Sequence, residues 1–211
     1  IKTIRGPGCE SEAAAEYERR FRTEARSAAR LHHPNIVSVY DSGREGDTAY
    51  LVMEFVQGDD LKHHLERGVR FSAQSAVKLV LGLLMALDHA HAQNVVHRDV
   101  KPANIIRTPE GEYVLTDFGL TRAMMTTGLT SHTGAALGTP AYMSPDIETT
   151  AQSDLYGLGC VLFEMLTGAP PFVADSQQQV LMRHIRDVPQ LEKLPPGARK
   201  VTGWLLEKDP R

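Results

Sequence analysis

The sequence predicts an α+β fold of two lobes, in which a small β-sheet with one helix is followed by a mostly helical lobe. Three observations favour this prediction. Strand-like stretches are concentrated before residue 57, long apolar helical patterns follow residue 58, and a polar, glycine-containing segment at residues 57–60 separates the two regions. We therefore predict a first lobe over residues 1–57 and a second lobe over residues 58–211.

The composition is that of an ordinary globular protein. Hydrophobic residues make up 42% and charged residues 23% of the 211 positions, which excludes a disordered or collagen-like chain. The net charge of −3 gives no basic surface for nucleic acid. The longest apolar run, residues 79–87, is much shorter than the ~20 residues of a membrane span. Cys9 and Cys160 suit a reducing compartment, so we expect a cytoplasmic location. If a longer parent chain is anchored in a membrane, we expect this domain to lie on the cytoplasmic side.

The first lobe is predicted to contain three strands and one helix. Residues 1–5 alternate apolar and polar side chains, as a strand does, and a breaker cluster follows at residues 6–11. The next segment, 12–31, has the periodicity of a helix whose apolar face consists of Tyr17, Phe21, Ala28 and Leu31. The remaining predicted elements of this lobe are strands at 36–40 and 49–56, joined by a polar turn at 41–48.

Glu24 interrupts the apolar face of the predicted helix. It follows Phe21 by three positions and precedes Ala28 by four, so the helix should bury it. An unpaired buried charge is costly. We therefore expect Glu24 to have a partner.

The second lobe is predicted to be mainly helical. Its predicted helices cover residues 61–66, 73–93, 154–167, 175–187 and 197–207. Short strand-like pieces lie at 95–96, 105–106 and 113–115. Residues 120–140 are rich in Thr, Ser, Gly and Ala and show little periodicity, which predicts an exposed loop.

Two spaced motifs carry the chemistry of the second lobe. The first is His97-Arg98-Asp99-Val100-Lys101-Pro102-Ala103-Asn104, and the second is Asp117-Phe118-Gly119. In this order they resemble H-R-D-x-x-x-x-N and D-F-G of serine/threonine protein kinases. The chain is most similar to bacterial kinases of the eukaryotic (Hanks) type, and the resemblance covers essentially all 211 residues.

The resemblance implies transfer of the γ-phosphate of ATP to Ser or Thr hydroxyls of protein substrates, with Mg²⁺. Such transfer depends on positioning and on stabilisation of charge, and Mg²⁺ prefers oxygen ligands. By resemblance, Asp99 would orient the substrate hydroxyl and accept its proton, and Lys101 would neutralise the γ-phosphate. Asn104 and Asp117 would hold the metal ion. Thr139 resembles the threonine that bonds Asp99 and Lys101 in this family.

The resemblance also assigns the nucleotide site. Ile1-Lys2 matches the end of V-A-I-K, so Lys2 would contact the α- and β-phosphates, with Glu24 as its partner. The residues that resemble the adenine site are Met53 as the gatekeeper, Glu54 and Val56 as donors of backbone contacts, and Ile106 as the floor under the ring.

The loop at 120–140 resembles a regulatory segment. Arg98 precedes the catalytic aspartate, and kinases of that type often pair this arginine with a phosphate on the loop. Candidate positions are Thr126, Thr127, Thr130, Ser131 and Thr133. We expect Thr133 to be autophosphorylated. One copy of the chain could phosphorylate another within a homodimer. Asp154 resembles the buried aspartate that anchors the catalytic loop, and Ala28, His97 and Phe118 resemble a stacked internal spine.

The chain departs from the family pattern in three places. It lacks the Gly-rich loop and the first two strands, so we expect a fragment truncated at both ends whose isolated activity is reduced. Asp146 stands where the family has a glutamate, and the stretch from there to Asp154 is short. Two alternatives remain open: a pseudokinase or scaffold that binds without turnover, and a small-molecule phosphotransferase. Phosphate on the protein itself would favour a protein kinase.

Overall fold

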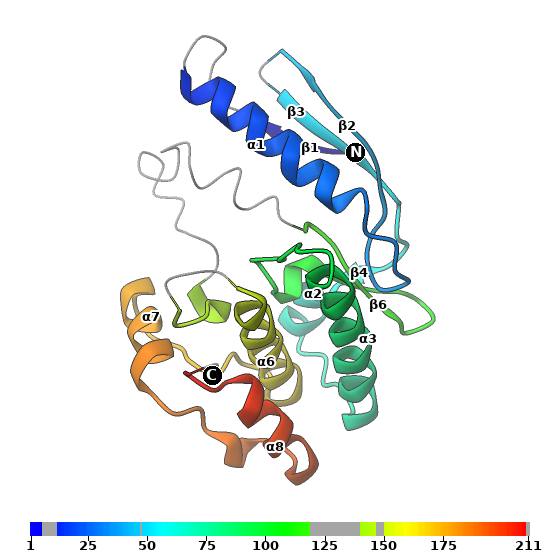
Figure 1. Ribbon diagram of the computed structural model, residues 1–211. Coiled ribbons are helices and arrows are strands. Elements are labelled where there is room, and N and C mark those ends of the chain that lie inside the picture. Colours follow the sequence, from blue (N-terminus) through cyan, green and yellow to red (C-terminus); the bar gives the residue numbers. More distant parts are fainter. Residues whose placement is uncertain (6–11, 47, 119–139, 147–149, 210–211) are drawn as a thin grey trace.

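The structure is a computed structural model that describes residues 1–5, 12–46, 48–118, 140–146 and 150–209. It confirms the α+β class: a small sheet with helix α1 lies at one end, and helices dominate the other end (Figure 1). The first elements are β1 (Lys2–Arg5), α1 (Glu12–Ala28), β2 (Val39–Glu45) and β3 (Thr48–Met53). The others are β4 (Asp59–Asp60), α2 (Leu61–Glu66), α3 (Ala73–His91), η1 (Pro102–Asn104), β5 (Ile105–Arg107), β6 (Tyr113–Leu115), η2 (Pro140–Tyr142), α6 (Ala151–Thr167), α7 (Gln177–Arg186), η3 (Leu191–Lys193) and α8 (Pro196–Leu205).

The first sheet is antiparallel, in the order β1-β3-β2, so that β3 is central. The register places Lys2 opposite Leu51. Helix α1 covers this sheet by packing Tyr17, Phe21 and Ala25 against side chains of β3, including Leu51. This packing orients α1, and with it Glu24, relative to the strand that carries Lys2.

The prediction for β2 was wrong in its bounds. The strand runs from Val39 to Glu45, whereas the sequence predicted a strand at 36–40 and a turn at 41–48. The polar residues Asp41 and Ser42 read as a turn, but an edge strand tolerates them because one of its sides is open to solvent. Gly46, with φ at 57°, follows the strand in a conformation that favours glycine.

The second sheet has three short strands in the order β4-β5-β6. It confirms the strand-like pieces predicted at 105–106 and 113–115. The piece at 95–96 forms no strand and lies in the connection that follows α3. The lobe boundary predicted at residues 57–58 falls between β3 and β4 and stays a prediction.

The main core lies between α3 and α6. Leu79, Leu83 and Leu87 repeat every four residues along α3 and are completely buried with Leu158 and Met165 of α6. Each such side chain contributes about 2 kcal/mol of hydrophobic burial, which fixes α6 as a rigid base. Asp154 in the first turn of α6 is thereby held at a defined place. No helix among the described residues combines the length and apolarity needed to cross a lipid bilayer.

Candidate active site

The loop between α3 and η1 is fixed by one buried carboxylate. Asp154, only 1% exposed, accepts the backbone N–H of His97 at 2.8 Å and that of Arg98 at 2.7 Å. The imidazole Nε2 of His91, at the end of α3, lies 2.8 Å from Oδ2 of Asp154. These contacts hold the loop to α6, which is the anchoring role expected for Asp154.

Two residues of the site adopt left-handed backbone conformations. Arg98 has a φ of 70° and Asp117 a φ of 68°. This region is unfavourable for residues with a Cβ and costs on the order of 1 kcal/mol or more. Arg98 is held by the bond from its N–H to Asp154. The surrounding contacts therefore impose the conformation.

Asp99, Lys101 and Asn104 form one bonded cluster. The Lys101 ammonium lies 2.7 Å from Oδ2 of Asp99. The Nδ2 group of Asn104 donates to the backbone oxygen of Asp99 at 2.8 Å and to its Oδ2 at 3.1 Å. These contacts orient the Asp99 carboxylate, and both charged side chains keep about a fifth of their surface exposed. The structure thus brings together the three residues that the sequence placed in one motif.

Asp117 follows β6 by two residues and contacts Lys2 of β1. Its Oδ2 forms an ion pair of 2.5 Å with Nζ of Lys2. Its Oδ1 is buried and has no hydrogen-bond partner among the described residues. A buried carboxylate oxygen without a donor is costly, so this atom is available to a ligand.

The expected ion pair between Lys2 and Glu24 is not formed. Glu24 is largely buried, as expected, but its Oε1 lies 3.2 Å from Nη1 of Arg98. The ammonium of Lys2 is directed to Asp117 instead. The physical reason is that Arg98 already compensates Glu24, and Lys2 is paired with Asp117.

Aromatic and apolar residues line the space behind these charges. The rings of His97 and Phe118 meet edge to face, with centroids 4.6 Å apart. Ala28, Met53 and Phe118 are among the residues around a cavity of about 10 Å³, which has room for at most one water molecule. The three residues expected to stack, Ala28, His97 and Phe118, are all buried.

The adenine candidates lie around the end of β3. Met53 is its last residue, and the N–H of Glu54 donates to the backbone oxygen of Ser38 at 2.9 Å. Val56 and Ile106 are half-buried, the latter on β5. Backbone geometry in this segment is therefore set by a bond to the residue that precedes β2.

Some expected residues lie outside the described part of the chain. These are Gly119, Thr139 and the phosphorylation candidates Thr126, Thr127, Thr130, Ser131 and Thr133. Within the described part, no group of three or more His, Cys, Asp or Glu side chains could hold a metal ion. A site built from Asp117 and Asn104 would provide one carboxylate and one amide, leaving other positions to water and phosphate, as is usual for Mg²⁺.

Comparison with known proteins identifies the family of the chain. The model of the family described as "Protein kinase domain" matches residues 2–211. The chain belongs to this family.

Within the protein kinase domain family, the chain is similar to bacterial serine/threonine kinases. It is 43% identical to a probable serine/threonine-protein kinase of Streptomyces coelicolor over 183 residues, 82% of this chain and 27% of that protein. It is 41% identical to PrkC of Bacillus subtilis over 204 residues, 92% of this chain and 31% of the relative. With PknA of Mycobacterium tuberculosis the identity is 41% over 206 residues, 92% of this chain and 48% of the relative. The chain therefore spans less than half the length of these relatives.

Sequence reasoning missed two contacts of the kinase site. It gave Arg98 a role toward the 120–140 loop but did not place it beside Glu24. It placed His91 within the predicted helix 73–93 and gave it no partner, whereas this imidazole bonds Asp154. The contact between Arg98 and Glu24 could have been predicted. A buried Glu24 required a cation, and Arg98 was one of the cations assigned to the site.

Proposed function

We propose that this kinase domain transfers the γ-phosphate of ATP to Ser or Thr hydroxyls of protein substrates. The observation that carries the proposal is the bonded cluster of Asp99, Lys101 and Asn104, which lies on a loop anchored by Asp154. The similar bacterial relatives named as serine/threonine kinases support the same activity. The long 120–140 loop favours a protein acceptor over a small molecule.

In this proposal each side chain of the cluster has a separate task. Asp99 is held by Asn104, so its carboxylate is directed to accept a hydrogen bond from the attacking hydroxyl and then its proton. Lys101, beside it, would neutralise charge on the phosphoryl group in transfer. Lys2 would contact the α- and β-phosphates.

Mg²⁺ fits the residues present. The unpartnered Oδ1 of Asp117 is an oxygen ligand without a donor, and Asn104 uses its Nδ2 in bonds to Asp99, which leaves its Oδ1 for a cation. These two side chains would hold the ion, which would neutralise phosphate charge. When a cation is bound, Asp117 no longer needs Lys2 as its only counter-charge, which would release the lysine toward phosphate.

The adenine ring would lie between the end of β3 and β5. The N–H of Glu54 is used by Ser38, so its carbonyl would accept from the adenine amino group, and Val56 would contribute backbone groups beside it. Met53 would border the ring at the back, and Ile106 would lie beneath it.

Regulation would act through Arg98. We expect a phosphate on Thr133, added by a second copy of the kinase, to attract the Arg98 guanidinium, because a phosphate carries about −1.5 to −2 charges. Glu24 would then lose its present partner and become available to Lys2. We expect this chemistry to take place in the cytoplasm.

Incubation with Mg-ATP, followed by intact-mass measurement and peptide mapping, tests the proposal. The longer parent protein and its Asp99→Asn variant are compared. Phosphate on residues 120–140 of the parent, and none on the variant, is the expected result. Equal phosphate in both would contradict the role of Asp99. Nucleotide binding without phosphate in either protein would favour a scaffold that binds without turnover.

A further inference from the structure

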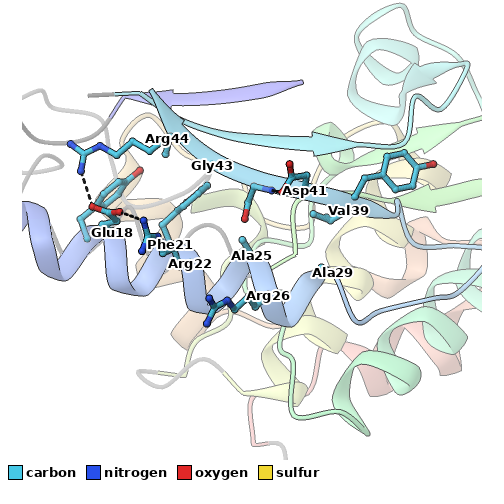
Figure 2. A pocket seen from close by; sticks show the side chains of 14 residues that line it. Glu18, Phe21, Arg22, Ala25, Arg26, Ala29, Val39, Asp41, Gly43 and Arg44 are labelled. Atoms are coloured by element: carbon cyan, nitrogen blue, oxygen red, sulfur yellow. Dashed lines mark hydrogen bonds and ion pairs between the residues drawn. The ribbon is translucent and has the colours of Figure 1, made fainter. Parts of the chain in front are cut away.

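Five buried side-chain atoms have no hydrogen-bond partner in the described part of the chain. Tyr17 lines a groove of about 450 Å³ between α1 and β2 (Figure 2), and Asp117 belongs to the proposed metal site. Arg107 and Tyr113 are neighbours that act on one another. The fifth atom, Nε2 of His184, belongs to a residue that is 1% exposed and lines neither this groove nor the small cavity of the kinase site. A buried donor or acceptor without a partner is costly, so this atom requires its own explanation.

A chain of hydrogen bonds leads to His184 from the residues that follow α8. The Lys208 ammonium donates to the Tyr156 hydroxyl at 3.1 Å and to the backbone oxygen of His184 at 2.5 Å. The same hydroxyl lies 2.9 Å from Nδ1 of His184. The rings of Tyr156 and Phe172 border the ammonium, with centroids at 5.4 Å and 4.3 Å. These contacts hold α7, which carries His184, against α6, which carries Tyr156.

The donors of this chain determine the tautomer of His184. An ammonium can only donate, so the Tyr156 oxygen accepts from Lys208 and has its own proton free for Nδ1 of His184. The reverse arrangement would leave the phenol proton without an acceptor inside the protein. Burial and the Lys208 charge lower the pKa of His184 to about 4, so the imidazole is neutral near pH 7. Nε2 therefore carries the hydrogen and is a buried donor without a partner.

Other ionisable groups near this chain do not compensate Nε2. Cys160 and Asp146 act on Tyr156, and Cys160 and Asp187 act on Lys208. Burial raises the pKa of the Cys160 thiol, which keeps it neutral. The two carboxylates have contacts of their own: Asp146 accepts from the Ser144 hydroxyl, and Asp187 lies 3.9 Å from the Arg183 guanidinium.

The backbone of Ala141 in η2 is the acceptor available to Nε2. It acts on the imidazole as an acceptor does, by opposing the lowering of the pKa of His184. Because Tyr156 occupies Nδ1, the Ala141 carbonyl faces Nε2, but no hydrogen bond of ordinary geometry is formed. Helix α7 packs against η2, so a small shift of η2 toward α7 would close the bond.

The same η2 segment lies beside the catalytic loop. The two meet at Gly157 of α6, where a Cβ would lie 2.9 Å from the carbonyl oxygen of Val100 and 3.6 Å from that of Tyr142. Val100 directly follows Asp99, and Tyr142 directly follows Ala141. The position of Ala141 is therefore coupled to the surroundings of the proposed catalytic carboxylate.

We propose that His184 is a positioning residue for the acceptor substrate, and that its Nε2–H bonds the Ala141 carbonyl when an acceptor segment is bound. The inference rests on the proposed kinase activity, in which the acceptor hydroxyl lies at Asp99. An acceptor bound there contacts the neighbouring η2 segment and selects one position of it. Closing the bond satisfies a buried donor, so it stabilises the bound arrangement. His184 itself touches no reacting atom.

Two amide variants separate the roles of the two imidazole nitrogens. His184→Gln reaches the position of Nε2 and keeps a donor for Ala141, whereas His184→Asn is shorter and keeps only a polar group near the position of Nδ1. The acceptor probe is a synthetic peptide with residues 122–138 of this chain, and peptide and ATP are varied separately in steady-state phosphorylation. His184→Asn should raise KM for the peptide about three- to tenfold and leave kcat and KM for ATP unchanged. His184→Gln should stay within about twofold of wild type in all three constants.

The kinetic outcomes separate this proposal from the proposed function. Equal KM for the peptide in all three proteins, or an equal rise in both variants, overturns the positioning role. A fall in kcat alone would mean a loss of folded enzyme and overturns it as well. A wild-type protein that transfers no phosphate contradicts the proposed function instead.

Proton–nitrogen NMR of the imidazole tests the bond without phosphoryl transfer. Near neutral pH the wild-type spectrum should show hydrogen on Nε2 of His184 and none on Nδ1. Addition of the peptide, with Mg²⁺ and a non-hydrolysable ATP analogue, should shift the Nε2–H resonance as the bond to Ala141 closes. Hydrogen on Nδ1, or an Nε2–H resonance that the peptide leaves unchanged, overturns the proposal whatever the activity.

Discussion

Glu24 of α1 and Arg98 of the catalytic loop, 74 positions apart in the chain, are joined by an ion pair of 3.2 Å. Their side chains are only 15% and 17% exposed, so water screens the pair poorly. The pair connects the helix of the small sheet directly to the loop that carries Asp99. It also explains why Lys2 bonds Asp117, since the carboxylate expected to receive this lysine already has a partner.

The Glu24–Arg98 pair should stabilise the fold measurably. In a double-mutant cycle of Glu24→Gln and Arg98→Gln, we expect a coupling free energy of about 1–2 kcal/mol, between that of exposed and fully buried pairs. Urea unfolding of the four proteins measures it. The exposed pair Lys62–Glu66 serves as the control and should show about 0.3–0.5 kcal/mol. Equal coupling for the two pairs would contradict the structure.

Lys2→Met should abolish phosphoryl transfer without loss of the fold. The substitution removes the cation beside Asp117 and the proposed phosphate contact, so we expect kcat/KM to fall at least ~100-fold. Phosphate incorporation into a protein acceptor measures the effect, and circular dichroism checks the fold. Lys62→Met, an exposed lysine of α2, is the control and should retain wild-type activity. A Lys2→Met protein with wild-type turnover would refute the assignment.

His184 should make stability depend on pH. Burial, reinforced by the nearby charge of Lys208, lowers the pKa of His184 to about 4, and its Nδ1 lies 2.9 Å from the Tyr156 hydroxyl. In the unfolded chain this imidazole titrates near 6.5, so the unfolded state binds more protons between these values. The contribution of neutral His184 to the free energy of unfolding is therefore complete above pH 6.5 and is lost as the pH falls toward 4. The stability advantage of wild type over His184→Asn should shrink by about 3 kcal/mol from pH 7 to pH 4.

Urea unfolding at a series of pH values checks the His184 prediction. A parallel series with His32→Asn, which changes a histidine exposed to solvent, is the control for the substitution itself. An advantage of wild type over His184→Asn that stays constant across the range would show that this histidine is not held in its neutral form.

Tyr142 should stabilise the ionised form of Glu164. The Tyr142 hydroxyl donates to Oε2 of Glu164 at 2.5 Å. Burial raises the pKa of Glu164, and this hydrogen bond opposes the rise. In Tyr142→Phe the pKa of folded Glu164 rises further, so the variant loses stability relative to wild type as the pH increases through that titration. We expect a deficit of about 1.5–3 kcal/mol at pH 7 and a smaller one at pH 4.

Thermal or urea unfolding of Tyr142→Phe at the two pH values provides the measurement. Tyr40→Phe is a matched control, because Tyr40 is 66% exposed and should change stability by less than about 0.5 kcal/mol at either pH. A deficit for Tyr142→Phe that is larger at pH 4 than at pH 7 would reverse the sign and rule out an ionised acceptor.

The sequence predicted those elements of the fold whose structure depends on residues close together in the chain. The helix of α3 follows from apolar residues every three to four positions, and Gly168, in the left-handed conformation, ends α6 where expected. The bounds of β2 were wrong because a polar edge strand has the same composition as a turn. The motifs also placed Asp99, Lys101 and Asn104 together, since they lie within six positions of one another.

Long-range partner choice could not be predicted. The buried position of Glu24 follows from helix periodicity, but whether Lys2 or Arg98 compensates it depends on how two lobes meet. A sequence reports which residues need a partner more readily than it reports which partner they obtain.

The left-handed conformations of Arg98 and Asp117 set two selective pressures against each other. Glycine at either position would relieve backbone strain on the order of 1 kcal/mol, yet it would delete a guanidinium or a carboxylate. At 98 the loss of the ion pair with Glu24 would outweigh this gain, whereas at 117 glycine would also remove the buried, unpartnered Oδ1. A library sorted only for survival on heating should therefore keep arginine at 98 and accumulate glycine at 117, while one sorted for turnover should keep aspartate there. The residue at 117 in a descendant would record which demand its lineage met.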